Sequence, residues 1–200
     1  MAIYGEEELR ALGLRHCGRN VRLSRMASLY GIENISLGDN VRIDDFCVLS
    51  AGLGGIDIGR NVHVAVFCSL IGRGRISVGD FANLSSRVSI YSSSDDYSGR
   101  TMTNPTLPPA YTGAVHADVT LGKHVIVGCG SVILPGVRIG IGAAVGSLSL
   151  VRTDCHEFTM YAGTPAREIG PRDRNLLALE AALREEEARA GNGDADRSAR

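Results

Sequence analysis

The sequence predicts an all-β fold: a parallel β-helix built from hexapeptide coils, with a long inserted loop and a C-terminal α-helix. Three observations support this prediction. Aliphatic residues recur with a period of six, glycines and small residues recur in step with them, and one long polar insertion interrupts the pattern. Residues six apart do not share a face of an α-helix. They do share a position on stacked three-sided coils, in which each side is one short strand and a turn.

The six-residue period groups the aliphatic residues into triplets, one triplet for each coil. A single coil cannot bury its aliphatic side chains, so the coils must stack to form a continuous core. A shorter pattern at Leu23 and Leu29 indicates a starting coil, and we expect five to six coils in all. The triplets are Leu37, Ile43 and Leu49; Ile58, Val64 and Leu70; Val78, Leu84 and Ile90; Leu121, Val127 and Ile133; and Ile139, Val145 and Val151.

Other positions repeat together with the triplets. A glycine follows the first aliphatic residue of each triplet, where we expect a tight corner that uses its conformational freedom. Cys47 and Cys68 share one coil position and are expected to be buried as small apolar residues. The recurring glycines are Gly38, Gly59, Gly79, Gly122 and Gly140, and a column of inward-facing small residues is predicted at Val41, Val62, Ala82, Val125 and Ala143.

Composition indicates one compact domain without a strong excess of positive or negative charge. The 200 residues are 44% hydrophobic, and the formal net charge is −1. This charge favours neither a nucleic acid nor a membrane surface as a partner. With no signal-peptide pattern, no long apolar segment and five cysteines that form no C-x-x-C pair, we expect a cytoplasmic protein.

Three segments depart from the repeat. The polar insertion 91–117 is a long loop inside a regular solenoid, and such loops are usually functional. Leu176, Leu179, Ala182 and Leu183 make a narrow apolar stripe, which predicts a C-terminal helix from about residue 173 to about residue 190, followed by a disordered tail. The predicted organisation is an N-terminal cap with a short helix over 1–20, a β-helix over 21–170, and the C-terminal helix and tail over 171–200.

Two stretches, VILPGVRIG and YAGTPAREI, carry a family resemblance. Over roughly residues 20–170 the sequence resembles the left-handed β-helix acyltransferases built on hexapeptide repeats. The resemblance implies a homotrimer with an active site in each groove between subunits, and acetyl-CoA as the donor. A narrower resemblance is to the nucleotide-sugar acyltransferases acting on dTDP-4-amino-4,6-dideoxyglucose. The stretches that carry it are NVRIDDFCVLS, NVHVAVFCSL, GDFANLSSRVSIY and DDYSGRTMTNPTLP.

The donor site can be predicted from the shape of CoA and from this resemblance. The extended pantetheine arm needs a groove lined by small residues, and Gly128, Cys129, Gly146 and Ser147 supply them. The resemblance implies donor contacts at Cys129 and Ser147. Arg167 is a candidate partner for a CoA phosphate, with Arg152 or Lys123 assisting. The alternative is that the two glycines only form corners and that Arg167 is only solvated.

The insertion bears on the acceptor. Hexapeptide acetyltransferases that act on sugar hydroxyls place a catalytic histidine in this loop, and the resemblance puts Asp95 at that position. An alcohol must lose its proton as it attacks, so it depends on a base. A neutral amine already has a free lone pair. The sequence therefore favours an amino-sugar acceptor.

The coil period also predicts an outward-facing polar column. Arg42, His63 and Asn83 each precede the middle aliphatic residue of successive coils, which should place them about 4.8 Å apart. His63 is the candidate base or acceptor-orienting group, Asn83 is a second catalytic candidate, and Arg42 could hold a phosphate of the nucleotide sugar. The remaining acceptor-site candidates are Asp44 and Asp45 for the ammonium group, and Asp96 and Tyr97 in the loop, where turn formation is the alternative role.

The predicted function is an acetyl-CoA-dependent N-acetyltransferase acting on a nucleotide-linked amino sugar by direct attack of the amine, without a metal. The alternatives are a sugar O-acetyltransferase of the galactoside or maltose type, a non-catalytic trimeric scaffold, and a zinc-dependent protein of the carbonic-anhydrase type. The zinc alternative would need histidines to meet across an interface, and the available ones are His63, His116 and His124.

Overall fold

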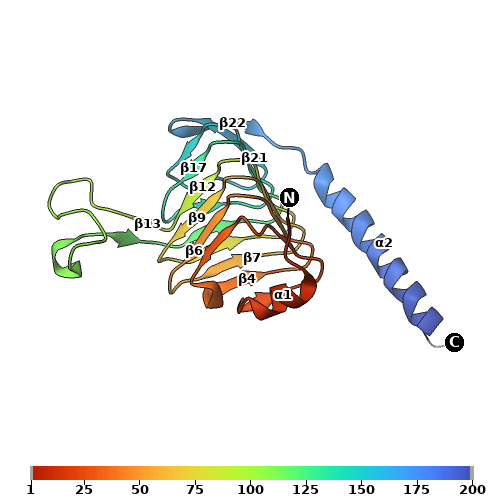
Figure 1. Ribbon diagram of the computed structural model, residues 1–200. Helices are drawn as coiled ribbons and strands as arrows, with labels where there is room; N and C mark the ends of the chain where they lie inside the picture. Colours follow the sequence, from red (N-terminus) through yellow and green to blue (C-terminus); the bar gives the residue numbers. More distant parts are fainter. Residues whose placement is uncertain (1, 199–200) are drawn as a thin grey trace.

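The computed structural model describes residues 2–198, with side chains as far as residue 189. The chain forms a left-handed β-helix, a three-sided prism in which each coil contributes one strand to each side (Figure 1). The three sheets contain six, eight and six strands, and strands from successive coils pair in parallel. Within residues 2–198, six complete coils stack and β21 begins a seventh, so the predicted fold class is confirmed.

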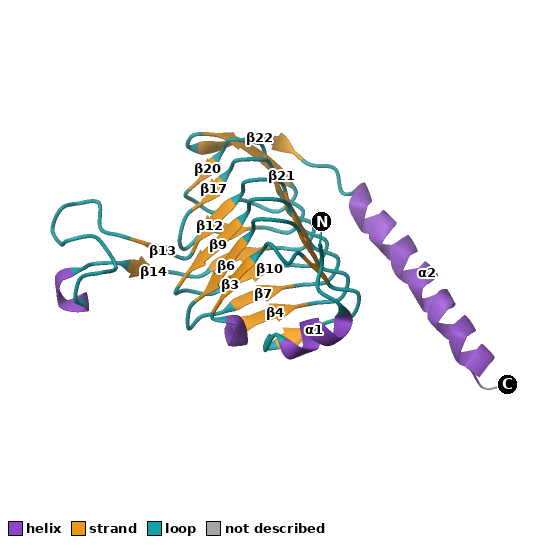
Figure 2. Cartoon of the chain, viewed as in Figure 1, coloured by secondary structure: helices purple, strands orange, loops and turns teal. Residues whose placement is uncertain are grey.

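From β1 to β20 the strands of the prism occupy the three sides in rotation, and β21 and β22 both join the second side (Figure 2). The first side consists of β1 (His16–Cys17), β4 (Ile35–Leu37), β7 (Ile56–Ile58), β10 (Ile76–Val78), β15 (Val119–Leu121) and β18 (Arg138–Ile139). The second side consists of β2 (Arg22–Leu23), β5 (Arg42–Ile43), β8 (His63–Val64), β11 (Asn83–Leu84), β16 (Ile126–Val127), β19 (Ala144–Val145), β21 (Thr159–Gly163) and β22 (Ala166–Pro171). The third side consists of β3 (Ser28–Tyr30), β6 (Val48–Ala51), β9 (Ser69–Gly72), β12 (Ser89–Tyr91), β17 (Val132–Ile133) and β20 (Leu150–Val151).

The core runs along the axis of the prism. Every aliphatic residue of the five predicted triplets is at most 3% exposed. The predicted column of small residues, from Val41 to Ala143, is at most 2% exposed, and Cys47 and Cys68 are fully buried. The period of six therefore reports the inward positions of the coils, as the sequence predicted.

The recurring glycines serve a different purpose from the one expected. Gly38 and its equivalents do not adopt positive φ angles. A Cβ atom at Gly38 would lie 2.7 Å from the carbonyl carbon of Gly59 in the next coil, so these positions require glycine because two backbones approach closely. The left-handed corner residue comes two positions later, at Asn40 (φ 58°) and its equivalents.

The insertion leaves the prism after β12. It begins and ends in a small antiparallel ladder between β13 (Ser93–Ser94) and β14 (Val115–His116), and its outer part contains the 3-10 turn η2 (Pro109–Tyr111). In Figure 1 this segment projects sideways from the coils. The solenoid then resumes in register, because β10 and β15 pair directly across the insertion.

The two ends of the chain add helices to the outside of the prism. α1 (Glu6–Ala11) lies beside the first coil, and a second 3-10 turn, η1 (Ile32–Asn34), follows β3 (Figure 1). α2 spans Asn175–Ser198. Its backbone is helical through most of the segment that was expected to be a disordered tail, and residues 199–200 lie outside the described part. Neither α-helix in the described chain is both long and apolar enough to cross a bilayer.

Leu70 tests the dependence of the fold on its axial core. Leu70→Ala removes a fully buried side chain and should lower the free energy of unfolding by about 2–5 kcal/mol. The matched control is Leu53→Ala, because Leu53 is 80% exposed at a corner and should change stability by no more than about 0.5 kcal/mol. Denaturant titration measures both, and equal losses would contradict the assigned core.

Candidate functional site

A chain of four polar side chains crosses the second side of the prism. His63 pairs in register with Arg42 on one side and with Asn83 on the other, so the predicted column exists. Asp44, two residues after Arg42 in the same coil, links the members: Arg42 Nε donates to Asp44 Oδ1 at 2.7 Å, and His63 Nε2 lies 2.9 Å from Asp44 Oδ2. His63 Nδ1 lies 3.1 Å from Asn83 Oδ1.

This arrangement limits what His63 can do. Both ring nitrogens lie within hydrogen-bond distance of a protein oxygen, whichever tautomer the ring adopts. A general base needs a free nitrogen within reach of the proton that it removes. The geometry therefore favours the second of the two roles expected for His63, that of an orienting group.

Asp44 is the negatively charged residue that connects Arg42 and His63 in this row of polar side chains. Its side chain is only 14% exposed. Burial alone would raise the pKa of the carboxyl, but the hydrogen bonds from Arg42 and His63 outweigh it and hold the pKa of Asp44 below its usual value. Asp45, its neighbour, accepts a hydrogen bond from the Ser24 hydroxyl instead. The two adjacent aspartates are thus already engaged in different contacts.

The predicted donor residues gather at one corner. We call the corner between the second and third sides the second corner; Gly128, Cys129, Gly146 and Ser147 all lie there in neighbouring coils. Gly128 is needed for stacking, because a Cβ atom there would lie 2.4 Å from the amide nitrogen of Ser147. Gly146 has more space around it. A Cβ atom there would lie 3.1 Å from its nearest neighbour, the Cβ of Ala162.

The predicted arginines are exposed near the end of the solenoid. Arg167 pairs in register with Ala162, the residue that lies against Gly146, so it is close to the donor corner. Its guanidinium donates to the carbonyl of the preceding residue, Ala166, at 3.2 Å. Arg152 follows β20 and is also exposed.

The base of the insertion forms a cavity of about 430 Å³. Asp95 and Tyr97 line it together with Tyr91, Leu134 and Pro135. Asp95 is exposed and Tyr97 is 92% exposed. The cavity opens from the third side of the prism, so within one chain Asp95 and His63 are on different sides.

Asp96 has the turn-forming role that was the alternative for this residue. Its carboxylate accepts hydrogen bonds from the amides of Ser98 and Thr101 and from the hydroxyl of Thr101. These hydrogen bonds lower the pKa of Asp96. The residue shapes the loop beside the cavity.

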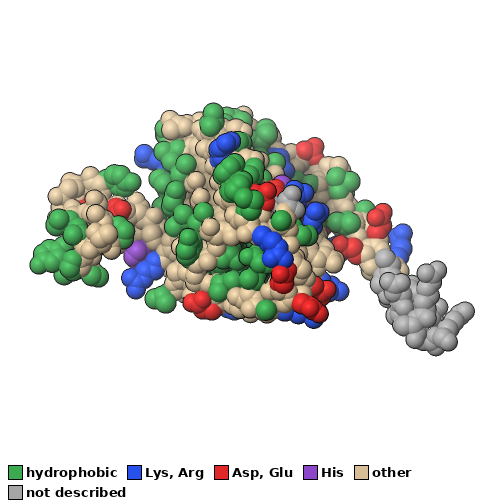
Figure 3. All heavy atoms as spheres, in the orientation of Figure 1, with side chains coloured by type: hydrophobic (Ala, Val, Ile, Leu, Met, Phe, Trp, Pro, Cys, Tyr) green, Lys and Arg blue, Asp and Glu red, His purple; other side chains and the backbone are tan. Residues whose placement is uncertain are grey.

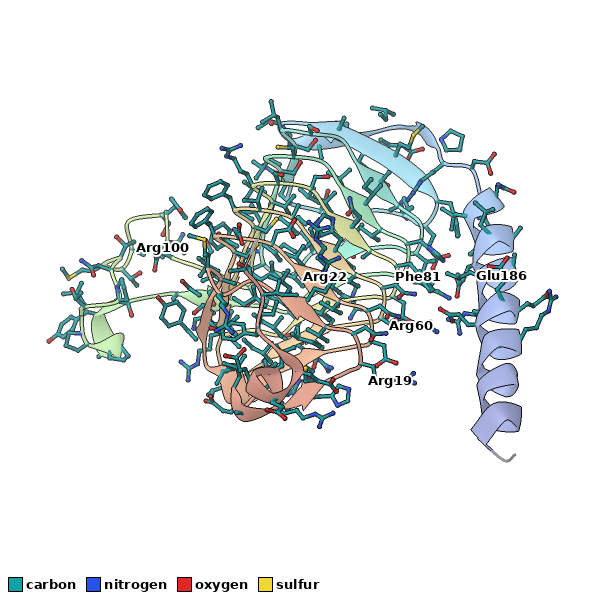
Figure 4. All side chains as sticks on the ribbon, turned by 45° about the vertical axis from the view of Figure 1, so that its right-hand side comes forward. Arg19, Arg22, Arg60, Phe81, Arg100 and Glu186 are labelled. Atoms are coloured by element: carbon teal, nitrogen blue, oxygen red, sulfur yellow. The ribbon has the colours of Figure 1, made fainter. Side chains whose placement is uncertain are left out.

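Lys123 lies away from the donor corner, beneath α2. Its ammonium is 2.5 Å from Glu180, which also contacts His124 at 2.6 Å and Arg184 at 2.6 Å. This is the corner between the first and second sides, here called the first corner. Figure 4 shows α2 running along it, with Arg60 and Phe81 on the prism facing the helix.

The helix is held by polar contacts rather than by its predicted apolar stripe. Leu179 is 64% exposed and Leu183 is 40% exposed, whereas Glu180 is 8% exposed. Farther along, Glu187 accepts two hydrogen bonds from one guanidinium nitrogen of Arg60, at 2.7 and 2.8 Å. The sequence gives no periodic signal for the contacts of Glu180 with Lys123 and His124 or of Glu187 with Arg60, because α2 lies outside the coil repeat.

Phe46 and Phe67 were also not singled out from the sequence. Their rings stack at the second corner with centroids 5.0 Å apart. They occupy equivalent positions of successive coils, 21 residues apart, so the coil repeat itself would have revealed the pair.

A relative from Escherichia coli decides the family. It is named "dTDP-4-amino-4,6-dideoxy-D-glucose acyltransferase" and is 52% identical over 184 residues, which cover 92% of this chain and 96% of the relative. The chain belongs to the dTDP-4-amino-4,6-dideoxyglucose acyltransferases. The resemblance seen in the coil motifs is thereby confirmed, and the protein is an acyltransferase.

Solved structures of another N-acyltransferase agree with this family assignment. AntD from Bacillus cereus, in complex with dTDP and 3-hydroxybutyryl-CoA, matches with a TM-score of 0.90 and 41% identity over 94% of this chain and 100% of AntD. An AntD variant in complex with dTDP-4-amino-4,6-dideoxyglucose and coenzyme A matches with a TM-score of 0.89 and 41% identity over 92% of this chain and 98% of that one. No family model matches the sequence.

A maltose O-acetyltransferase from Clostridium difficile shares the fold alone, with 20% identity and a TM-score of 0.57 over 84% of this chain and 75% of that one.

For the zinc alternative, the three candidate histidines are dispersed: His63 contacts Asp44, His116 contacts Ser93, and His124 contacts Glu180. In the described part of this acyltransferase, no three His, Cys, Asp or Glu side chains come together as metal ligands.

Glu180 gives a pH-dependent test of how α2 is held. Burial would raise its pKa, but hydrogen bonds from Lys123, His124 and Arg184 outweigh it and lower the pKa to about 2. A carboxyl with a lowered pKa stabilises the fold fully above its unfolded pKa, here 4.5, and progressively loses that effect as the pH falls toward 2. Glu180→Gln should therefore cost about 1–3 kcal/mol at pH 7 and clearly less at pH 3.

Glu186→Gln is the matched control, because Glu186 is exposed on the same helix. Denaturant titrations of the three proteins at pH 7 and pH 3 measure the effect. Similar losses in both variants, or a loss in Glu180→Gln that does not depend on pH, would contradict the proposed role of the buried carboxylate.

Proposed function

We propose that this protein transfers the acetyl group of acetyl-CoA to the 4-amino group of dTDP-4-amino-4,6-dideoxyglucose. The main support is the match to a relative of that name over nearly the whole length of both chains. AntD, of nearly the same shape, has been solved with both kinds of substrate. Because CoA thioesters and nucleotide sugars are made in the cytoplasm, these substrates also support the predicted cytoplasmic location.

The reaction needs no covalent enzyme intermediate. The neutral amine attacks the thioester carbonyl, the new carbon–nitrogen bond forms, and the carbon–sulfur bond breaks. The nitrogen loses one proton and the departing CoA sulfur gains one, so the products are the amide and free CoA thiol. Because the amine sheds its proton after attack rather than during it, an aspartate can take the place of a histidine in the loop.

The site residues receive roles from their surroundings. Asp95, exposed at the loop-base cavity, is the candidate acceptor of the amine proton. His63, held between Asp44 and Asn83, orients the acceptor, and Arg42 is half exposed and free to turn one edge of its guanidinium toward a phosphate. Cys129, Ser147, Gly146 and Arg167 form the donor side at the second corner.

A homotrimer would unite these groups. Asp95 lies at the third side and His63 on the second side of one chain, so a groove between two subunits is the simplest way to bring a loop against a polar column. The outer surface of the third side supports such packing. Figure 3 shows hydrophobic side chains gathered over β17, β12, β9 and β6, and the members of this surface include Tyr30, Val48, Ile71, Tyr91, Val132, Leu134 and Leu150.

The proposed acceptor can be tested directly. Purified protein is mixed with acetyl-CoA and either dTDP-4-amino-4,6-dideoxyglucose or its 4-hydroxy counterpart, and the release of CoA thiol is followed. We expect turnover with the amine and little with the alcohol. Turnover with the alcohol alone would support the O-acetyltransferase alternative. A parallel series with longer acyl-CoA donors, including 3-hydroxybutyryl-CoA, measures the acyl preference.

His63 and Asp95 separate orientation from proton transfer. Because both ring nitrogens of His63 face protein oxygens within hydrogen-bond distance, His63→Asn should lower kcat/KM by about tenfold or less and act mainly on the KM of the acceptor. Asp95→Asn should lower kcat by about 10²–10⁴-fold if Asp95 accepts the proton. Steady-state kinetics of both variants measure these effects, and Asp96→Asn reports what disturbing the loop turn beside Asp95 does by itself. A large kcat loss at His63 with none at Asp95 would reverse the two roles.

A further inference from the structure

A ladder of large side chains occupies the second corner beside the polar chain. Its members are Phe46, Phe67 and Arg87 from three successive coils. The two rings are nearly parallel, 14° apart, with centroids separated by 5.0 Å. The guanidinium of Arg87 lies 5.2 Å from the centre of the Phe67 ring. Phe46 and Phe67 are nevertheless 44% and 45% exposed.

These side chains occupy backbone positions that do not favour them. Phe46, Phe67 and Arg87 have φ angles of 61°, 63° and 61°, in the left-handed region. That conformation is unfavourable for bulky residues and is tolerated best by glycine and asparagine. At the first corner the corresponding residues of the early coils are Asn20, Asn40 and Asn61. The second corner thus carries aromatic rings where the turn alone would favour asparagine.

Other aromatic residues with positive φ are covered within the chain. Phe81 stacks on His124 with centroids 5.1 Å apart, beneath α2, and Phe158 lies 4.3 Å from the guanidinium of Arg174. These contacts explain why a ring is retained at those corners. Phe46 and Phe67 contact one another, yet their outer surfaces remain open to solvent.

We propose that Phe46, Phe67 and Arg87 form a platform that binds the base of a nucleotide substrate. This inference rests on the proposed function, which supplies two nucleotides: the thymidine nucleotide of the sugar acceptor and the adenine nucleotide of CoA. Both combine a flat base, which can stack on an aromatic face, with phosphates that an arginine can hold.

The chemistry of the corner favours a nucleotide over the surface of a second copy of the chain. Aromatic residues and arginine are common at the centre of a protein–protein interface, but aspartate is depleted there. Here Arg87 lies against the Phe67 ring, and Asp44 precedes Phe46 by only two residues. Stacked aromatic rings flanked by a cation are instead the usual elements of a site for a base and its phosphates.

Calorimetric titration of each variant with dTDP and, separately, with CoA tests the platform. Phe67→Ala should lower the affinity for one of the two ligands by about 5- to 100-fold and leave the affinity for the other within about twofold of the wild type. Phe46→Ala should lower the affinity for the same ligand. Phe67→Tyr keeps an aromatic face and should bind as the wild type does. Leu53→Ala is the control, because Leu53 is 80% exposed at the corner between the third and first sides, away from the ladder and from the donor residues.

Phe67→Asn separates binding from folding. Asparagine suits the left-handed backbone, so this variant should unfold at the same temperature as the wild type or higher while it loses the same nucleotide affinity as Phe67→Ala. A residue retained only for structure would show the opposite pattern, with lower stability and unchanged affinity.

Two results would overturn the platform. One is wild-type affinity of Phe46→Ala and Phe67→Ala for both dTDP and CoA. The other is a smaller assembly in light scattering together with equal loss of both ligands, which would make the rings part of a subunit interface. Failure of the proposed function is distinguishable, because the wild-type protein would then bind neither nucleotide or acylate no amino sugar.

Discussion

The stacking of coil upon coil is the constraint on which the rest of this structure depends. Each coil lies about 4.8 Å from the next, so every inward position must be filled by an aliphatic or small side chain and every close backbone contact must be free of a Cβ atom. Gly38 and its equivalents meet the second requirement, and the triplets meet the first. The outer surface follows from the same constraint, since residues at one coil position become neighbours in space even when 43 residues separate them in sequence, as Asn83 and Ile126 are.

This constraint explains why much could be predicted from the sequence. A period of six determines which residues point inward, and it predicts that Arg42, His63 and Asn83 share one column. It also places the donor candidates Gly128 and Gly146 at one corner. What a residue of this column can do chemically, however, depends on its neighbours outside the column. Asp44 lies beyond the strand, at the turn, yet it holds Arg42 and His63 together and occupies the ring nitrogen that a base would need.

The features that could not be predicted are those that the repeat does not govern. Nothing periodic links Glu180 to Lys123 and His124, or Glu187 to Arg60, because a helix after the last coil can pack against several corners. The apolar stripe of α2 predicts a helix but not its contacts, and the buried Glu180 carboxylate links α2 to Lys123 and His124 of the prism. The role of Gly38 and its equivalents is also not predictable from the repeat, since glycine meets steric and conformational demands alike, and the backbone geometry shows that the demand here is steric.

The corners therefore carry information that the sides do not. On the sides of the prism, an inward-facing residue has to be aliphatic or small, whereas an outward-facing residue can be of almost any type. The residue type at a side position therefore mainly tells which way the side chain faces. A left-handed corner position prefers asparagine or glycine for reasons of backbone alone, and Asn20, Asn40 and Asn61 follow that preference. Where a corner departs from it, some interaction must compensate for the strain. At Phe81 that interaction is with His124 and the cations beneath α2. Phe46 and Phe67 stack on each other and Arg87 lies against Phe67, yet both rings stay nearly half exposed, and a bound nucleotide base, as proposed, would cover them.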